Sequence, residues 1–137
     1  MAEARDDWWV IGSAAVVLHG ARGGRARDID VMLSVVDARR ILPGLGVALT
    51  PGRADDRFRS DFYCSWQAPP VPVDFMAGFH VRGALLVPRT REASADAPGI
   101  FVPSREELLA ILRTFGRAKD LERAALLAAV NPSPASP

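Results

Sequence analysis

Short apolar runs separated by polar turns define the first part of the chain. Residues 8–11 are apolar and include two β-branched side chains, so this run predicts a buried strand. Gly12 and Ser13 follow as a turn, in which Gly12 allows close approach of the backbone and Ser13 is a good helix N-cap. Residues 13–18 then predict a short helix, which His19 closes with Gly20 at the C′ position.

A second strand is predicted over residues 28–33, after a loop at residues 21–27 that is rich in glycine and arginine. Side chains alternate between the two faces of a strand, so Asp28 and Asp30 share one face and the apolar residues between and after them point to the other. The two carboxylates are then about 7 Å apart along the strand, and they repel each other unless a cation lies between them.

Mg²⁺ meets this requirement, because it commonly binds one or two carboxylates together with phosphate oxygens of a substrate. Across from the pair, the helix that begins at Gly12 and Ser13 presents free N–H groups and a dipole that favour an anion. The pair of Asp28 and Asp30 facing this turn therefore predicts a site for Mg²⁺ and a nucleoside triphosphate (NTP). The alternative is an ordinary strand edge with two solvated aspartates.

The rest of the pattern predicts one α/β domain, in which helices pack on a mixed sheet. Ser104 is a predicted N-cap, and Glu107 completes a capping box for a helix that Gly116 ends. Other helices are predicted at residues 35–42 and 120–130, strands at 46–49, 61–67, 71–77, 84–89 and 99–102, a polar loop at 90–98, and a disordered tail at 131–137.

Asp74 interrupts the apolar strand predicted at residues 71–77, where Val73 and Phe75 flank it. A carboxylate inside an apolar strand is costly to bury unless it is paired or binds a metal. Asp74 is therefore either part of a polar site or a residue on the solvent-facing side of the strand.

Composition indicates a globular protein of one domain. With 137 residues, 49% of them hydrophobic and 24% charged, the chain can bury one core. A net charge of +1 gives no overall basic field of the kind that dedicated nucleic-acid-binding proteins carry. The single cysteine, Cys64, excludes an intramolecular disulfide and fits a reducing compartment. No apolar run approaches the ~20 residues that span a bilayer and no signal peptide opens the chain, so we expect a cytoplasmic protein without membrane contact.

The G-S pair at residues 12–13, followed by D-I-D at residues 28–30, resembles the G-[GS]…D-x-D signature of the DNA polymerase beta-like nucleotidyltransferase superfamily. The fuller pattern, G-S-A-x-x-x-x-H-G and R-D-I-D-V, is most similar to small bacterial nucleotidyltransferases related to abortive-infection toxins. The resemblance implies a nucleotidyltransferase fold, a mixed twisted sheet flanked by helices, over residues 1–130.

The resemblance also implies a reaction, the transfer of a nucleoside monophosphate from an NTP to an acceptor hydroxyl with Mg²⁺ or Mn²⁺. In such proteins a third carboxylate lies on a strand next to the D-x-D pair, and Asp74 fits this place by its order in the chain. The implied catalytic and metal-binding residues are Asp28, Asp30 and Asp74. The implied nucleotide-binding residues are Gly12, Ser13, Arg25, Arg27 and Lys119, although the arginines of the loop could equally be solvated.

Lys119 lies in the sequence R-x-K-D-L before the last helix, which also resembles a C-terminal motif of these enzymes. It is the only lysine among 17 basic residues, so a generic cation at this position would more commonly be arginine. A specific role at the phosphates is therefore predicted, and a surface lysine at the start of a helix is the alternative. Arg113, His19 and His80 have no assigned role.

The acceptor is left open by the sequence, and so is the oligomeric state. A small molecule, an RNA end such as that of tRNA, and a protein side chain are the three candidate acceptors. The resemblance to toxins implies a cognate antitoxin as a further partner. The alternative in another class is a binding or scaffold protein that keeps the fold without catalysis.

Overall fold

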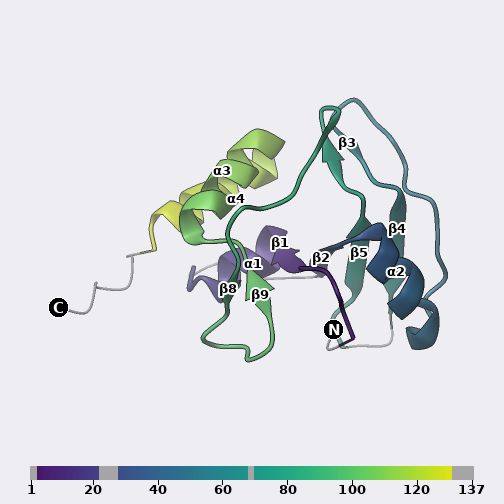
Figure 1. Cartoon of the computed structure of the whole chain (residues 1–137). Helices are drawn as coiled ribbons and strands as arrows, with labels where there is room; N and C mark the ends of the chain where they lie inside the picture. The colour runs from purple at the N-terminus through teal and green to yellow at the C-terminus, as the bar shows by residue number, and fades with distance from the viewer. Residues whose placement is uncertain (1–2, 22–27, 68–69, 131–137) are drawn as a thin grey trace.

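The computed structural model describes residues 3–21, 28–67 and 70–130 (Figure 1). Two of the predicted phosphate contacts, Arg25 and Arg27, and the predicted tail at 131–137 lie outside the described residues. The strands are β1 (Trp9–Ile11), β2 (Ile29–Leu33), β3 (Phe58–Arg59), β4 (Phe62–Trp66), β5 (Val73–Ala77), β6 (His80–Val81), β7 (Ala84–Leu85), β8 (Glu92–Ala93) and β9 (Phe101–Val102). The helices are α1 (Gly12–Leu18), α2 (Val35–Ile41), α3 (Arg105–Phe115) and α4 (Ala118–Ala128), with a 3₁₀ turn at Pro43–Leu45.

The central sheet contains four strands in the order β1-β2-β5-β4. Its two inner strands, β2 and β5, are parallel, whereas β1 and β4 pair antiparallel with them at the edges. Figure 1 shows α3 and α4 side by side near α1, and α2 on the other side of the molecule beside β4 and β5. The predicted mixed sheet flanked by helices is confirmed.

The two faces of this sheet have separate apolar clusters. Val31 and Leu33 of β2 face the larger cluster, to which all four helices contribute buried side chains. Met32, which lies between them, faces the smaller cluster together with Ile111 and Phe115 of α3. This alternation explains why the central strands are apolar at consecutive positions, since both faces are covered. A membrane-spanning helix is not found in the described part of the chain, where none is long and apolar enough.

Helix α1 begins one residue earlier than predicted, and Ser13 is not its N-cap. The N-cap residue is Ile11, and no side chain caps this helix end. Gly12 has φ +68° and turns the chain directly from β1 into α1, so Ser13 already lies within the helix. At the other end Gly20 has φ +95°, and its N–H donates to the carbonyl of Val17, as a residue at C′ should.

The capping box predicted for α3 is half right. The hydroxyl of Ser104 accepts a hydrogen bond from the backbone N–H of Glu107. The carboxylate of Glu107 does not return to Ser104, however, but accepts the backbone N–H groups of Arg89 and Thr90, each at 2.7 Å. The irregular segment before β8 has donors that need a partner, and this contact supplies one. Helix α4 begins at Ala118 rather than at residue 120.

Three predictions about strands are wrong or incomplete. Residues 46–49 form no strand. They lead to Pro51, which makes an isolated bridge with Phe62 but has no N–H group with which to extend a ladder. Only the first two of residues 84–89 are in a strand, β7. The loop predicted at residues 90–98 contains β8, which pairs with β9.

Candidate active site

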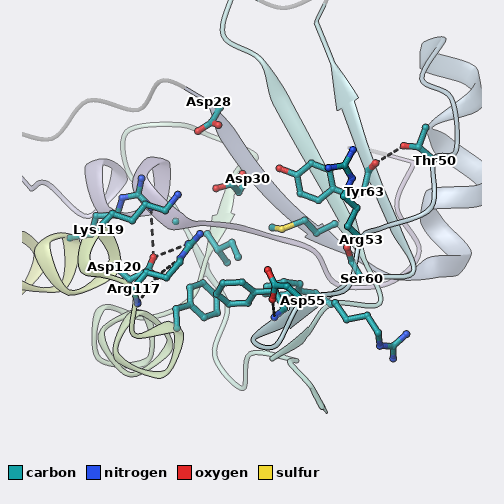
Figure 2. Close-up of a pocket in the computed structure, with 18 of the residues that line it drawn as sticks. Asp28, Asp30, Thr50, Arg53, Asp55, Ser60, Tyr63, Arg117, Lys119 and Asp120 are labelled. Atoms are coloured by element: carbon teal, nitrogen blue, oxygen red, sulfur yellow. Dashed lines mark hydrogen bonds and ion pairs between the residues drawn. The ribbon is translucent and has the colours of Figure 1, made fainter. Parts of the chain in front are cut away.

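Three aspartates lie together at the start of the two inner strands. The parallel register places Asp30 of β2 opposite Asp74 of β5, and Asp28 immediately precedes β2. One carboxylate oxygen of each lies within 4.8 Å of the other two. Figure 2 shows Asp28 and Asp30 at one side of a cleft. The structure thus brings together the three carboxylates that the sequence singled out, although their chemical role is a separate question.

The electrostatics of this cluster fit a divalent cation. The pKa of Asp30 is raised to about 6, first by burial and then by the neighbouring carboxylates of Asp28 and Asp74, while Arg123 and Arg117 act in the opposite direction. Carboxylates that disfavour one another at this separation are stabilised by a cation between them. Because all the donors are hard oxygen atoms, the cluster suits Mg²⁺ or Mn²⁺ better than a soft metal.

Two hydroxyl groups from β4 fix the carboxylate of Asp74. Ser65, which is paired with Asp74 in the sheet register, donates to its Oδ1 at 2.7 Å, and Tyr63 donates to its Oδ2 at 3.2 Å. Burial raises the pKa of Tyr63, and the charges of Asp74 and Asp30 raise it further, so the phenol stays a hydrogen-bond donor. Both oxygen atoms of Asp74 therefore have one partner and keep lone pairs for another ligand.

Gly12 lies against this cluster, whereas Ser13 is less accessible. A β-carbon added to residue 12 would come within 2.8 Å of Oδ2 of Asp30, so only glycine fits without displacing the carboxylate. Gly12 lines the cleft. The residue Ser13 is only 9% exposed. The predicted phosphate contact of the turn therefore rests mainly on the backbone at Gly12.

The cleft has a volume of about 710 Å³ and two kinds of wall. On one side Arg117, the N-cap of α4, together with Lys119 and Arg123 of the helix itself, forms a surface that we call the basic wall. Figure 2 places Lys119 and Arg117 on one side of Asp28 and Asp30, and Tyr63 and Arg53 on the other side. A volume of this size is typical of pockets for small organic ligands.

The residues to which the sequence gave no role lie elsewhere. The Nε2 of His19 is 2.8 Å from the carbonyl oxygen of Pro103, which ties the end of α1 to the segment before α3. His80 contacts the carbonyl of Gly78 and the guanidinium of Arg59. Arg113 is exposed near the end of α3 and is not among the residues that line the cleft.

Sequence reasoning missed four residues of the site, namely Tyr63, Ser65, Arg117 and Arg123. In β4 the side chain of Cys64 is buried, so its neighbours Tyr63 and Ser65 share the opposite face of the strand. The sequence did not show that this face lies beside Asp74, because that depends on the register between β4 and β5. The spacing of three between Asp120 and Arg123 on a helix was a weaker signal.

Comparison with known proteins supports the fold. No protein-family profile matches the chain, and no curated protein sequence matches it either. A candidate nucleotidyltransferase of Thermotoga maritima, TM1012, has a similar structure, with a TM-score of 0.67 and 19% identity over 89% of this chain and 81% of its own. The lincosamide adenylyltransferase LnuA, with lincomycin bound, has a TM-score of 0.58 and 14% identity over 91% of this chain and 87% of its own.

The aminoglycoside-modifying protein ANT(2″)-Ia, solved in complex with adenylyl-2″-tobramycin, gives a TM-score of 0.54 and 17% identity over 88% of this chain and 77% of its own. Likenesses at such low identity show the fold and no more. The chain has the nucleotidyltransferase fold, as the sequence predicted.

Proposed function

We propose that the protein is a metal-dependent nucleotidyltransferase, which moves a nucleoside monophosphate from an NTP to an acceptor hydroxyl and releases pyrophosphate. The observation that carries this proposal is the cluster of Asp28, Asp30 and Asp74, with oxygen atoms within 4.8 Å of one another. Asp28 and Asp30 of this cluster line the same cleft as the basic wall. Carboxylates for a divalent cation and cations for a polyanion are the two requirements of a metal-bound triphosphate. The shared fold gives independent support.

In this proposal Asp28, Asp30 and Asp74 hold Mg²⁺ or Mn²⁺. When bound, such ions polarise the phosphoryl group and favour ionisation of the attacking hydroxyl. Asp74 accepts the proton of the acceptor hydroxyl. Tyr63 and Ser65 hold its carboxylate from behind, so that its remaining lone pairs point to a fixed place.

The phosphates are bound from two sides. The backbone at Gly12, with Ser13 behind it, approaches them from the end of β1, and Lys119 neutralises their charge from α4. Arg25 and Arg27 keep the predicted role of further phosphate contacts.

We propose a small molecule with a hydroxyl group as the acceptor. Two structures with the same fold hold antibiotics or their adenylylated product, tobramycin in one case and lincomycin in the other. The cleft is of a size that suits such ligands. The net charge of +1 offers no broad basic surface for an RNA acceptor. A protein or tRNA acceptor, with the protein as a toxin held silent by an antitoxin, is the second candidate, which the resemblance of the sequence motifs supports.

The proposal is tested by transfer of label. The purified protein is incubated with Mn²⁺ or Mg²⁺ and each NTP labelled at the α-phosphate, together with aminoglycosides, lincosamides, bulk tRNA or protein extract. We expect label on one class of acceptor, pyrophosphate release, and loss of both in Asp30→Asn. The class that is labelled decides between an antibiotic-type enzyme and a toxin.

The non-catalytic alternative predicts a different result. Calorimetry should show that the protein binds NTP with Mn²⁺ and much more weakly with excess chelator. Equal NTP affinity under both conditions, with no transfer to any acceptor, would mean that the fold serves binding alone. All three carboxylates are retained, which favours catalysis.

A further inference from the structure

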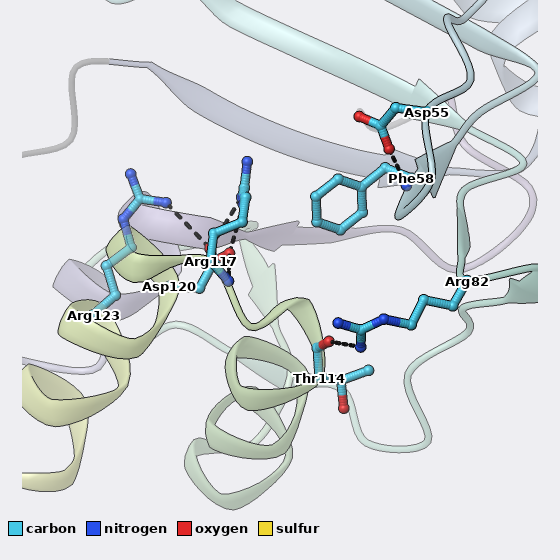
Figure 3. A network of polar contacts seen from close by, with 7 residues as sticks. All are labelled: Asp55, Phe58, Arg82, Thr114, Arg117, Asp120 and Arg123. Atoms are coloured by element: carbon cyan, nitrogen blue, oxygen red, sulfur yellow. Dashed lines mark hydrogen bonds and ion pairs between the residues drawn. The ribbon is translucent and has the colours of Figure 1, made fainter.

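Asp120 is a fully buried carboxylate next to the candidate active site, with 0% of the residue exposed. It accepts hydrogen bonds from the Nε and Nη2 atoms of Arg117 at 2.6 and 3.0 Å, and from the backbone N–H of Arg117 at 3.2 Å. Arg123, one helical turn further along α4, brings its Nη1 to 3.8 Å from Oδ1. A single buried carboxylate therefore binds two guanidinium groups, as Figure 3 shows.

A second contact restrains Arg117 from the other side of the cleft. Its guanidinium lies over the ring of Phe58, 4.8 Å from the centroid. That ring is itself packed against Phe79 and Phe115, with centroids 5.7 and 5.2 Å away. Asp120 and Phe58 thus define the position of the Arg117 guanidinium in two directions, one along its hydrogen bonds and one across its plane.

The same contacts leave donors free. Within the described residues, the Nη1 of Arg117 makes no hydrogen bond, and the guanidinium of Arg123 has only its ion pair with Asp120. Both arginines line the cleft. Their charges act on the aspartate cluster, since they lower the pKa of Asp30. The arginines are therefore held on one side and open toward the cleft on the other.

We propose that Asp120 is a positioning residue, which holds Arg117 and Arg123 in place to bind the triphosphate of the nucleotide. This inference rests on the proposed function, because it assigns a task within the same site. Asp120 itself touches no substrate and acts through the two arginines. Flexible arginine side chains lose much conformational entropy when they bind an anion, and a fixed carboxylate partner removes that cost before binding.

The sign of one substitution separates this role from simple charge balance. If Asp120 only neutralised the arginines, then Asp120→Asn would remove a negative charge and strengthen anion binding. If Asp120 positions them, the same variant weakens anion binding, because an amide cannot accept both hydrogen bonds of the Arg117 fork. The amide oxygen can still accept the backbone N–H of Arg117, so the start of α4 keeps its cap.

The chain offers a matched control in Asp37. This residue is also 0% exposed, is also the third residue of its helix, α2, and also has an arginine three positions on, Arg40. Its carboxylate accepts the backbone N–H groups of Arg5 and Asp6, outside the cleft. Asp37→Asn therefore reports the cost of losing a buried carboxylate without touching the basic wall.

The test uses inorganic tripolyphosphate with Mg²⁺ as the probe, so no acceptor is needed. Its affinity for the full chain is measured by calorimetry well below the melting temperature of each variant. We expect Asp120→Asn to bind about tenfold more weakly, the effect of losing a charge-assisted contact, and Asp37→Asn to bind as the wild type does. Arg117→Lys, which keeps the charge but not the fork, should show a similar loss, and adding Asp120→Asn to it should change little more.

Several results overturn the inference. Unchanged or tighter binding in Asp120→Asn does so, as does an equal loss in Asp37→Asn. If Asp120→Asn fails to fold, wild-type affinity in Arg117→Lys has the same consequence. A wild-type protein that does not bind tripolyphosphate overturns it as well. By contrast, tight binding that depends on Asp120 in a protein that transfers no nucleotide contradicts only the proposed function.

Discussion

Gly12 is packed directly against Asp30. A β-carbon on residue 12 would come within 2.8 Å of Oδ2 of Asp30, and the backbone at Gly12 has φ +68°. Glycine is thus needed for two separate reasons, the left-handed backbone and the close carboxylate. The turn after β1 and the aspartate cluster form one unit, which explains why they must be considered together.

We expect Gly12→Ala to displace the carboxylate of Asp30 and abolish metal-dependent NTP binding. Gly46→Ala is the control, because Gly46 has φ +76° but nothing within 4 Å of an added β-carbon. Both variants should lose about 1–2 kcal/mol of unfolding free energy from the strained backbone. Urea unfolding and calorimetry with Mn²⁺ and NTP measure the two effects. Intact NTP binding in Gly12→Ala would show that the close packing of residue 12 against Asp30 is not needed for NTP binding.

The metal-free protein should become less stable as the pH rises through the range in which Asp30 loses its proton. Its pKa is raised from 3.8 to about 6, so between these values the folded protein holds a proton that the unfolded chain has lost. The penalty for ionising Asp30 is absent below this window and complete above it, at most about 3 kcal/mol.

Asp30→Asn should remove that penalty. In urea unfolding with a chelator, the variant should be more stable than the wild type above pH 6 and similar to it near pH 4. Added Mg²⁺ should stabilise the wild type above pH 6 and have much less effect on the variant. If the free energies of unfolding of the wild type and of Asp30→Asn change in parallel between pH 4 and values above 6, the pKa of Asp30 is not raised.

Local patterns predicted much of the fold because they determine local structure. The short, β-branched apolar run before Gly12 favoured a buried strand, and the period-two arrangement of Asp28 and Asp30 gave them a common face. The face shared by Asp30 and Asp74, however, depends on parallel pairing between β2 and β5. Paired residues of these strands are 44 positions apart in the chain, and no local pattern specifies their pairing. The resemblance to a known family supplied that relationship.

The basic wall shows why other parts of the site could not be predicted. Sixteen of the seventeen basic residues are arginine, so residue type alone does not distinguish Arg117 or Arg123 from an arginine in solvent. Their importance arises from the burial of Asp120 and from Phe58 across the cleft, and both are tertiary contacts. Lys119 was singled out by the R-x-K-D-L resemblance and by its being the only lysine, and neither reason is a contact.

Tyr63 provides a test of the role of Asp74, which in our proposal accepts the proton of the acceptor hydroxyl. Tyr63→Phe keeps the ring and removes only the hydroxyl that donates to Asp74, while Ser65 still donates to the other oxygen. We expect kcat to fall by about tenfold, the cost of one hydrogen bond to a charged group, with KM for NTP little changed. Adding Ser65→Ala should reduce kcat further. An unchanged kcat in the double variant would show that Asp74 needs no support from β4.

Lys119 is the most exposed member of the basic wall, and its role is decided by comparison with Arg113. Both cations are exposed and lie near the corner between α3 and α4, but only Lys119 lines the cleft. Lys119→Ala should cost about 2–4 kcal/mol of transition-state stabilisation, as expected for the loss of one preorganised charge partner. Arg113→Ala should cost nothing measurable. Lys119→Arg should be only partly active, because a planar fork does not replace a compact ammonium group at a crowded phosphate.

Pyrophosphate release and thermal unfolding are measured side by side for these variants. Loss of activity in Lys119→Ala with an unchanged melting temperature supports a direct role at the phosphates. Full activity in Lys119→Ala would mean that Arg117 and Arg123 neutralise the triphosphate alone. Loss of activity together with a lowered melting temperature would instead assign Lys119 to the start of α4, where it precedes the buried Asp120.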